Sequence, residues 1–354
     1  MTVSFSQCPI KLDMPLQLVG YDKIRTAYQQ HDELFVSLLQ INDIKFISID
    51  CLGVSERLVS QIRQKVSPVY VFATHTHNGP DGLLDTNNSY HPLYGLSLTF
   101  GQYDELMEKK ILDAIDYCLD NLVSSPKLWI KEFKIEDLYS NRNQSELDYE
   151  QRVLILENEH FILIHLACHP TILGSSINEV SADFVHSFRK LSDKPVMFIN
   201  GPAGDISTRY TRHFQSFEEC DRFGQIIMDK ANQAVSKPLN IETNYLDYEI
   251  SLQTKMKEDI FNFETSELAL KYSIIKLGPL TFVTLPLEVC SQLTLSLDCY
   301  ILGYCNDYLL YLCDEKSYHK EFYEAVSSPF LIHEGHRLIR HIKEQLNEIN
   351  SSIS

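Results

Sequence analysis

The chain has 354 residues, of which 44% are hydrophobic and 22% are charged, the composition of an ordinary globular protein. Its 31 Lys and Arg residues against 48 Asp and Glu residues give a formal net charge of −17. A surface of that charge repels nucleic acid and anionic membranes, so we expect neither as a partner. No run of about 18 or more apolar residues occurs, so the sequence predicts no membrane span.

The N-terminus and the cysteines indicate the compartment. The first 18 residues lack a basic segment followed by an apolar core, so they do not resemble a secretory signal. The nine cysteines are odd in number and form no C-x-x-C pair, which favours reduced thiols over a disulfide framework. We therefore expect a cytoplasmic protein, and the sequence carries no signal for its oligomeric state.

The first hundred residues predict strands and one helix, then a long loop. Residues 34–42 and 45–53 are predicted as a hairpin of half-buried strands joined at Asn42-Asp43. Residues 55–66 have helical apolar spacing behind a capping serine. The wholly apolar run at 69–74 is typical of a strand buried on both faces, and a polar loop follows at 78–101.

The rest of the chain continues the alternation of strands and helices. Helices are predicted at 103–123, 182–191 and 216–235, near Leu287, and at 331–349; strands are predicted at 127–138, 151–158, 160–168, 195–200, 244–255, 270–277 and 280–285. This order predicts a layered α/β protein with mixed sheets. No linker divides the chain, so we expect one domain over residues 1–354.

Polar residues with metal-binding chemistry follow four of the predicted strands. In "FATHTHNGP", His75 and His77 leave a buried strand one residue apart, and alternation along a strand would send both side chains to one side. Neutral imidazole is the commonest metal ligand in proteins. His169 ends a second strand before Pro170, whose ring stops that strand. Taken singly, each histidine is also explained as a hydrogen-bonded strand-end residue.

Two further strand ends carry oxygen-bearing side chains. The turn "GPAGDIS" presents Asp205 and Ser207, and Glu288 follows Pro286. Proline is well suited to begin a helix, so we expect Glu288 in a first helical turn, where complementing the helix dipole is an alternative role. Ligand sites cluster at strand ends in α/β proteins, which favours one shared site for all four positions.

The stretches "ATHTHNGPDG", "ACHPT", "NGPAGDIS", "LPLEV" and "NDYLLYLCDEKSYHKEFYEA" stand in the order and context of a known family. Over about residues 18 to 335 the chain resembles the N-terminal catalytic domain of the neutral/alkaline (non-lysosomal) ceramidases. Members of that family are zinc-dependent amidases that cleave the N-acyl bond of ceramide into sphingosine and fatty acid. The resemblance therefore implies an α/β hydrolase domain with zinc as its cofactor.

The resemblance also implies roles for individual residues. Four of them would be the zinc ligands: His75, His169, Glu288 and Tyr311. His77 would not bind the metal but would face the reacting group.

The remaining implied residues concern the substrate. Arg142, in "SNRNQS", would hold the acyl or carboxylate end, and Tyr323, in "FYEA", would lie near the substrate carbonyl. Ser207 matches the serine of the family's Gly-Asp-Val-Ser-Pro motif, and Asn78 stands where the family has a serine on the pocket wall. Asp205 either orients a ligand histidine or shapes an Asx turn, and we place it with the substrate-binding group.

This residue set suits metal-assisted amide cleavage. Two imidazoles, a carboxylate and a phenolate are zinc ligands that leave a position for water. Zinc can lower the pKa of such a water from 15.7 to about 7 and can polarise an amide carbonyl. His77 would pass the proton of water to the leaving amine. Ser207 would either attack the carbonyl or donate to the oxyanion, and we favour the second role because the metal already supplies a nucleophile.

Several departures from the family leave the substrate open. Val-Ser-Pro has become Ile206-Ser207-Thr208, and no C-terminal β-domain or lipid-extracting apolar anchor is apparent. The expected partner is therefore an N-acyl amide that is either lipid-like or small and soluble. A metal-dependent esterase, another hydrolase on the same scaffold and a non-catalytic zinc-binding relative are the alternatives. An amidohydrolase barrel would carry its His-x-His on the first strand of an eightfold βα repeat. The strands predicted before residue 69 do not fit that arrangement.

Overall fold

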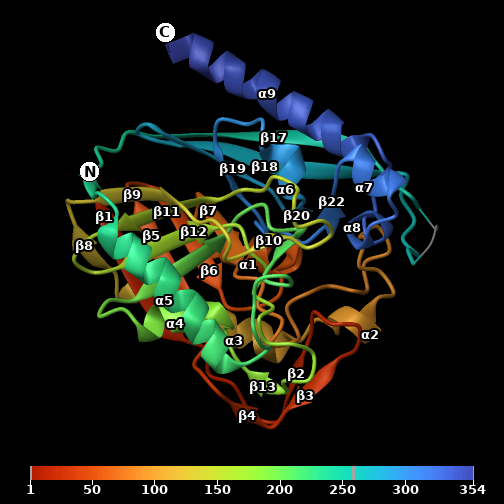
Figure 1. The fold of residues 1–354 in the computed structure, drawn as a ribbon, viewed down its shortest axis with the longest axis horizontal. Coiled ribbons are helices and arrows are strands. Elements are labelled where there is room, and N and C mark those ends of the chain that lie inside the picture. Colours follow the sequence, from red (N-terminus) through yellow and green to blue (C-terminus); the bar gives the residue numbers. More distant parts are fainter. Residues whose placement is uncertain (1, 257–259, 354) are drawn as a thin grey trace.

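The computed structural model describes residues 2–256 and 260–353, and three β-sheets form its frame (Figure 1). The first sheet has the strand order β7-β6-β5-β1-β8. Its strands are β1 (Val3–Pro9), β5 (Phe35–Ile41), β6 (Ile44–Ile49), β7 (Val69–Ala73) and β8 (Val123–Ser125). β5 and β6 form the predicted hairpin, with Ile41 opposite Ile44, whereas β6 and β7 run parallel. The sequence did not predict β1, which pairs with both β5 and β8.

The second and third sheets are also mixed. The second has the order β14-β12-β11-β9-β16 and the third the order β17-β18-β19-β21. Their strands are β9 (Trp129–Lys134), β11 (Arg152–Glu157), β12 (Ile162–Leu166), β14 (Val196–Asn200), β16 (Lys237–Pro238), β17 (Thr243–Gln253), β18 (Glu267–Leu277), β19 (Leu280–Thr284) and β21 (Tyr300–Leu302). The pairs β12–β14 and β19–β21 are parallel, and the others are antiparallel.

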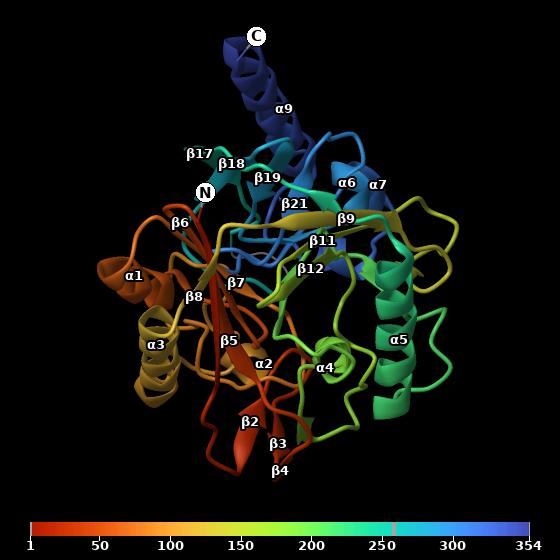
Figure 2. The ribbon, with the colours of Figure 1, turned by 90° about the vertical axis from the view of Figure 1, so that its left-hand side faces the viewer.

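Helices cover the outer faces of these sheets. The long ones are α1 (Glu56–Lys65), α3 (Glu105–Asp120), α4 (Phe184–Lys190), α5 (Phe217–Gln233) and α9 (Glu334–Ile353). Figure 2 shows α1 and α3 beside the first sheet, α4 and α5 beside the second, and α9 extending beyond the third. Side chains of Ser55, Asp104 and Ser216 accept from backbone N–H groups and so fix three helix starts. Within the described ranges, none of the helices has the length and apolar character of a membrane span.

The layers are held together by strands that are buried on both faces. In β6, Phe46 packs between the first and third sheets, while its neighbour Ile47 packs toward the helices. In β7, likewise, Tyr70 packs between the first and third sheets and Val71 packs toward the helices. The apolar face of α9 covers the outer side of the third sheet. The resulting order is helices, two edge-to-edge sheets, a third sheet and a helix, which confirms the predicted layered α/β fold with mixed sheets.

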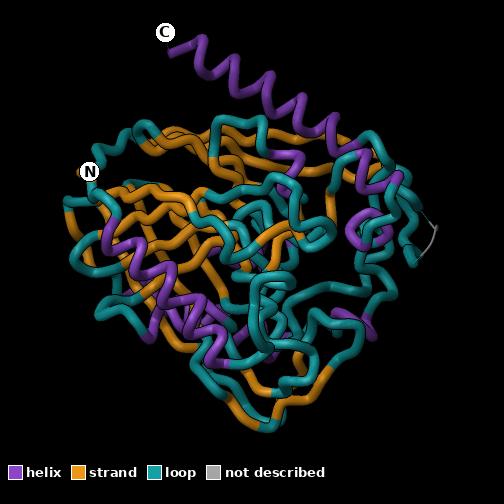
Figure 3. The backbone as a smooth tube through the Cα atoms, in the orientation of Figure 1, coloured by secondary structure: helices purple, strands orange, loops and turns teal. Residues whose placement is uncertain are grey.

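Short elements and loops surround the ends of the sheets (Figure 3). Four pairs of short strands lie there: β2 (Leu16–Leu18) with β3 (Arg25–Ala27), β4 (Gln29–Gln30) with β13 (Glu179–Val180), β10 (Ser140–Asn141) with β15 (Ile206–Ser207), and β20 (Glu288–Val289) with β22 (Tyr311–Leu312). The short helices are α2 (Ser97–Phe100), α6 (Ser291–Thr294), α7 (Glu315–His319) and α8 (Tyr323–Val326).

One predicted element is wrong. Glu288 does not lie in the first turn of a helix opening near Leu287: it begins β20, and α6 starts only at Ser291. The reason is a long-range pairing, because the N–H of Glu288 donates to the carbonyl of Leu310 at 3.0 Å and β20 runs parallel to β22. The local Pro286 signal did not reveal a partner strand more than twenty residues away.

A buried ion pair joins the first sheet to helix α4. Asp50, directly after β6, is contacted by both terminal nitrogens of Arg189 on α4, at 2.6 and 3.1 Å. The carboxylate of Asp50 also accepts from the N–H of Phe35 at 2.8 Å. Because the side chain of Asp50 is fully buried, its charge depends on this single cation.

We expect Arg189→Met to lower the free energy of unfolding by about 3–5 kcal/mol, because it leaves a buried carboxylate without its cation. The matched control is Lys190→Met on the same helix. Lys190 pairs with Asp221 in solvent, so its loss is expected to cost less than about 1 kcal/mol. Urea denaturation measures both, and equal shifts for the two variants would contradict the role given to Asp50.

Candidate active site

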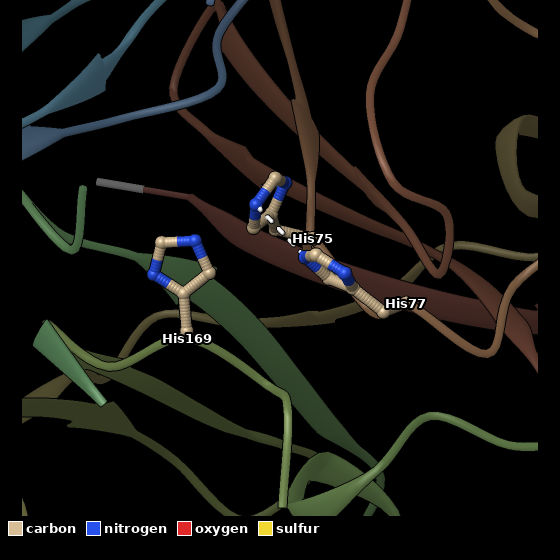
Figure 4. A group of neighbouring side chains, drawn as sticks. All are labelled: His75, His77 and His169. Carbon is tan, nitrogen blue, oxygen red and sulfur yellow. Dashed lines mark hydrogen bonds between the residues drawn. The ribbon is translucent and has the colours of Figure 1, made fainter. Parts of the chain in front are cut away.

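Two histidines from different sheets meet at the centre of the molecule. His75 follows β7 of the first sheet, and His169 follows β12 of the second. Both are fully buried, and their ring centroids are 4.9 Å apart at an angle of 74° (Figure 4). The strand-end histidines predicted from the sequence therefore do converge.

The path of the chain at His75 differs from a simple strand. β7 ends at Ala73, and His75 has a φ of 70°, in the left-handed region that a non-glycine residue rarely adopts. The strained turn is held by a 2.9 Å hydrogen bond from its N–H to the carbonyl of Cys51 and by stacking of its ring on Tyr304. His77 lies nearby, with its ring 5.0 Å from that of His75. The two rings are close because the backbone bends, not because of strand alternation.

Main-chain carbonyls fix the tautomers of both rings. The Nδ1 of His75 is 2.7 Å from the carbonyl oxygen of Leu52, and the Nδ1 of His169 is 2.6 Å from that of Ala203. A carbonyl oxygen only accepts, so each Nδ1 carries the proton. Burial lowers the pKa of His169 to about 4, so its ring is neutral at pH 7 and its Nε2 presents a lone pair.

Glu288 faces the Nε2 atoms of both rings. Its Oε2 lies 3.2 Å from Nε2 of His75 and 2.9 Å from Nε2 of His169. Its other oxygen accepts from the hydroxyl of Tyr308. Among the described residues, Oε2 of Glu288 and Nε2 of His169 find no hydrogen-bond donor. Lone pairs that face each other in a buried site require a cation between them, either a proton or a metal ion.

The spacing of these atoms fits a small divalent ion. Donors about 2.0–2.1 Å from a tetrahedral zinc lie about 3.3–3.4 Å from one another. The contacts of Glu288 with the two rings are close to that spacing, and so is the 3.4 Å between the Nε2 atoms of His75 and His77. The nitrogens of His75, His77 and His169 all lie within 4.8 Å of one another. This buried group can therefore hold a metal ion, and distances alone do not separate His77 from Glu288 as a ligand.

The strand pair β20–β22 brings Tyr311 to the same place. Tyr311 lies directly opposite Glu288 in the parallel register, and its hydroxyl accepts from Nη2 of Arg142 at 3.2 Å. Burial raises the pKa of Tyr311 well above its usual range, and Glu288 adds to this while Arg142 opposes it. Without a cation the phenol therefore keeps its proton.

Arg142 is held by a carboxylate that the sequence reasoning missed. Its Nε lies 2.6 Å from Oε1 of Glu324, whose Oε2 accepts from Nδ2 of Asn143 at 2.7 Å. The guanidinium also lies 5.6 Å from the ring centre of Tyr311 and 5.4 Å from that of Tyr323. Glu324 stands in "FYEA" beside the predicted Tyr323. Its position next to a predicted site residue was therefore a sequence signal for a carboxylate partner of Arg142. The role of Tyr308, one of 19 tyrosines, had no such signal.

The turn "GPAGDIS" positions several of these groups. Ala203 orients His169 through its carbonyl, and the N–H of His169 donates to the carbonyl of Ile206 at 2.9 Å. A Cβ added at Gly204 would lie 2.7 Å from the carbonyl oxygen of Glu288, so only glycine lets the turn pass this close to β20. Ser207, at the end of the turn, is buried and accepts from the N–H of Arg209 at 3.2 Å.

A cavity of about 700 Å³ opens above the group. Six of the predicted residues line it: His77, Arg142, Ser207, Glu288, Tyr311 and Tyr323. The volume is typical of a small-molecule site. His75 and His169 are buried beneath the cavity lining. Burial lowers the pKa of His77 well below its usual range, so its ring is neutral.

Two predicted substrate-binding residues lie elsewhere. Asn78 is not part of the cavity lining; its Nδ2 donates to the carbonyls of Ile177 and Glu179, at 3.0 and 2.8 Å. Asp205 is likewise outside the lining, and none of the histidines that the structure describes bonds it; it accepts from the N–H of Ser291 and from Nδ2 of Asn141, at 2.7 and 2.6 Å. Burial raises the pKa of Asp205 to about 7. The hydrogen bonds of both side chains are therefore made to backbone and side-chain groups of the neighbouring segments.

A second group of potential ligands has an ordinary structural explanation. His31, Asp32 and His186 place one nitrogen or oxygen each within 4.8 Å of one another, outside the cavity. Both oxygens of Asp32 already accept hydrogen bonds, one from the N–H of Ala182 at 2.9 Å and the other from the hydroxyl of Ser181. Asp32 therefore fixes the segment that leads into α4.

Comparison with known proteins identifies the fold. No family model and no curated protein matches the sequence. Among solved structures, the chain matches a neutral ceramidase from Pseudomonas aeruginosa with a TM-score of 0.78 at 13% identity, over 96% of this chain and 72% of that one. A structure described as a ceramidase complexed with C2 matches with a TM-score of 0.76 at 12% identity, over 96% of this chain and 73% of that one. The chain has a neutral-ceramidase-like fold.

The expectation of a ceramidase-like domain drawn from short motifs is thereby confirmed. At such low identity the likeness of the ceramidase structures concerns the fold alone.

We expect Tyr308→Phe to lower the free energy of unfolding by about 1–3 kcal/mol, because a buried oxygen of Glu288 loses its donor. Tyr304→Phe is the matched control. Its hydroxyl is also buried but has no hydrogen-bond partner among the described residues, so its removal is expected to cost little. Thermal and urea denaturation compare the two, and a larger loss for the Tyr304 variant would contradict the arrangement around Glu288.

Proposed function

We propose that this chain is a zinc-dependent hydrolase that cleaves an N-acyl amide bond. The observation that carries the proposal is the contact of Glu288 with His75 and His169 at the base of the cavity, where lone pairs meet in a buried site. The ceramidase-like fold supports the reaction class, because the similar structures are described as ceramidases. The identity of the metal rests on the donor set of imidazole nitrogens and a carboxylate oxygen, which suits zinc.

We assign the ligands to His75, His169, Glu288 and Tyr311. Glu288 is preferred to His77 because its carboxylate oxygen contacts both buried rings, and because it neutralises part of the charge of a divalent ion. Tyr311 lies opposite it in the register of β20 and β22. His77 is left on the cavity wall, where its Nδ1 has no hydrogen-bond partner among the described residues.

A zinc ion held there would lower the pKa of water and polarise an amide carbonyl. The protein groups around it supply the rest of the chemistry. His77 takes a proton from the attacking water and gives it to the nitrogen of the departing amine. Ser207 and Tyr323 line the cavity, and we assign their hydroxyls as donors to the oxygen of the cleaved carbonyl. Arg142, fixed by Glu324, holds a positive charge beside Tyr311.

We expect His169→Ala and His75→Ala to lose both the bound metal and turnover, because each removes one ligand of a buried ion. His77→Ala is expected to keep the metal and lose about 10²–10⁴-fold in kcat, the usual contribution of a proton-transfer group. His333→Ala, an exposed histidine on the loop before α9, is the control and should change neither. Elemental analysis of the purified variants gives the metal content, and an N-acyl amide assay gives the turnover.

Two results would overturn this assignment. Full turnover by protein stripped of metal with a chelator would refute the metal-dependent reaction. Loss of the ion in His77→Ala with its retention in Glu288→Gln would exchange the roles of these two residues. Including matched esters in the assay distinguishes an amidase from an esterase on the same scaffold.

Ser207→Ala separates the two roles of that hydroxyl. If it only donates a hydrogen bond to the developing oxyanion, we expect kcat to fall about 10²–10³-fold while hydrolysis stays well above background. If it attacks the carbonyl, turnover is expected to vanish, and the unmodified protein should show an initial burst of amine release. Stopped-flow detection of the amine with both proteins decides between the two.

A further inference from the structure

The lining of the cavity is divided between two kinds of chemistry. One part is apolar and aromatic, and it is formed by α2 with the residue before it, by Ile260 and by the stretch 308–326: Leu96, Phe100, Ile260, Tyr308, Leu310 and Val326. Another part is polar and basic, and it comes from the loops after β12 and β15: Thr171, Ser175, Arg209, Arg212 and Gln215. A ligand that fills this cavity meets both.

Arg209 and Arg212 differ from Arg142, the other arginine in the described cavity lining, in their hydrogen-bond partners. Each donates to a backbone carbonyl, Arg209 to that of Arg142 at 3.4 Å and Arg212 to that of Thr171 at 3.0 Å. Within the described part of the chain, no carboxylate lies within 4.0 Å of either guanidinium. Arg142, by contrast, is paired with Glu324. Arg209 and Arg212 therefore keep N–H donors and full charge for a ligand.

This charge stands out against the rest of the protein. The chain has 48 acidic residues against 31 basic ones, so carboxylates are abundant, yet those that the structure describes lie more than 4.0 Å from these two guanidinium groups. Among the described residues, the acidic ones in the cavity lining are Asp22 and Glu288, and Glu288 is engaged with the buried histidines. A concave site with low-dielectric walls concentrates the field of such cations. The planar guanidinium matches the geometry of carboxylate and phosphate groups.

We propose that the amide substrate carries an anionic group, a carboxylate or a phosphate, that binds to Arg209 and Arg212. Its acyl chain packs on the apolar part of the cavity, and its amine portion carries the anion. An N-acyl amino acid is the simplest molecule of this class. The inference rests on the proposed amidase function and specifies its substrate, because ceramide is uncharged and would leave both guanidinium groups without a partner.

The test compares three amides with the same acyl chain: N-octanoylglycine, N-octanoylethanolamine and the phosphate ester of N-octanoylethanolamine. Zinc-loaded protein is expected to give a higher kcat/KM for at least one anionic amide than for the neutral one. Arg209→Gln and Arg212→Gln should each reduce the ratio of anionic to neutral kcat/KM about 10–100-fold, mainly through KM. Arg57→Gln on α1, outside the cavity, is the matched control and should leave that ratio unchanged.

The outcomes separate this inference from the proposed function. A ratio near or below one that neither substitution changes would overturn the anionic substrate while leaving the amidase intact. If no amide is hydrolysed, the proposed function fails, and calorimetry with the same compounds then decides the inference. Tighter binding of an anionic amide that is lost in Arg212→Gln supports it, and equal binding of all three overturns it. The glycine and phosphate compounds show which anion is preferred.

Discussion

The organisation of this protein depends on one buried contact, in which an oxygen of Glu288 faces the Nε2 atoms of His75 and His169. A carboxylate in such a position is costly unless a cation balances it. The surroundings keep the arrangement in place: carbonyls of Leu52 and Ala203 fix the protons on the far side of each ring, and Tyr308 binds the second carboxylate oxygen. The site is thus built to attract a positive charge.

Three sheets are needed to make that contact. The edge strands β7 and β14 bring the ends of the first and second sheets together, and the segment after β21 runs between them. In that segment, the backbone N–H of Gly303 donates to the carbonyl of Asn200 at 3.0 Å, and the backbone N–H of Asn306 donates to the carbonyl of Val71 at 2.7 Å. The third sheet then leads into β20, which carries Glu288. If any one of the sheets were displaced, one of His75, His169 and Glu288 would move away from the other two.

Local sequence patterns predicted the long helices, the longer strands other than β1, and the two buried histidines, because apolar periodicity and strand-end polar residues are short-range signals. They failed where the structure depends on partners far away in the chain. Pro286 suggested a helix, but Glu288 pairs with the strand of Tyr311. The pairing of Glu324 with Arg142, more than 180 residues before it in the chain, is a contact of the folded structure that no local pattern encodes. Strands of two residues have no period to detect, so the pairs that frame the site were invisible to pattern analysis.

The histidine rings are oriented by main-chain oxygens rather than by side chains. A peptide carbonyl is present whatever residue occupies the position, so replacing Leu52 or Ala203 with another residue of similar size preserves the acceptor. Amino-acid substitutions at these two loop positions are therefore expected to leave the orientation of both imidazole rings unchanged.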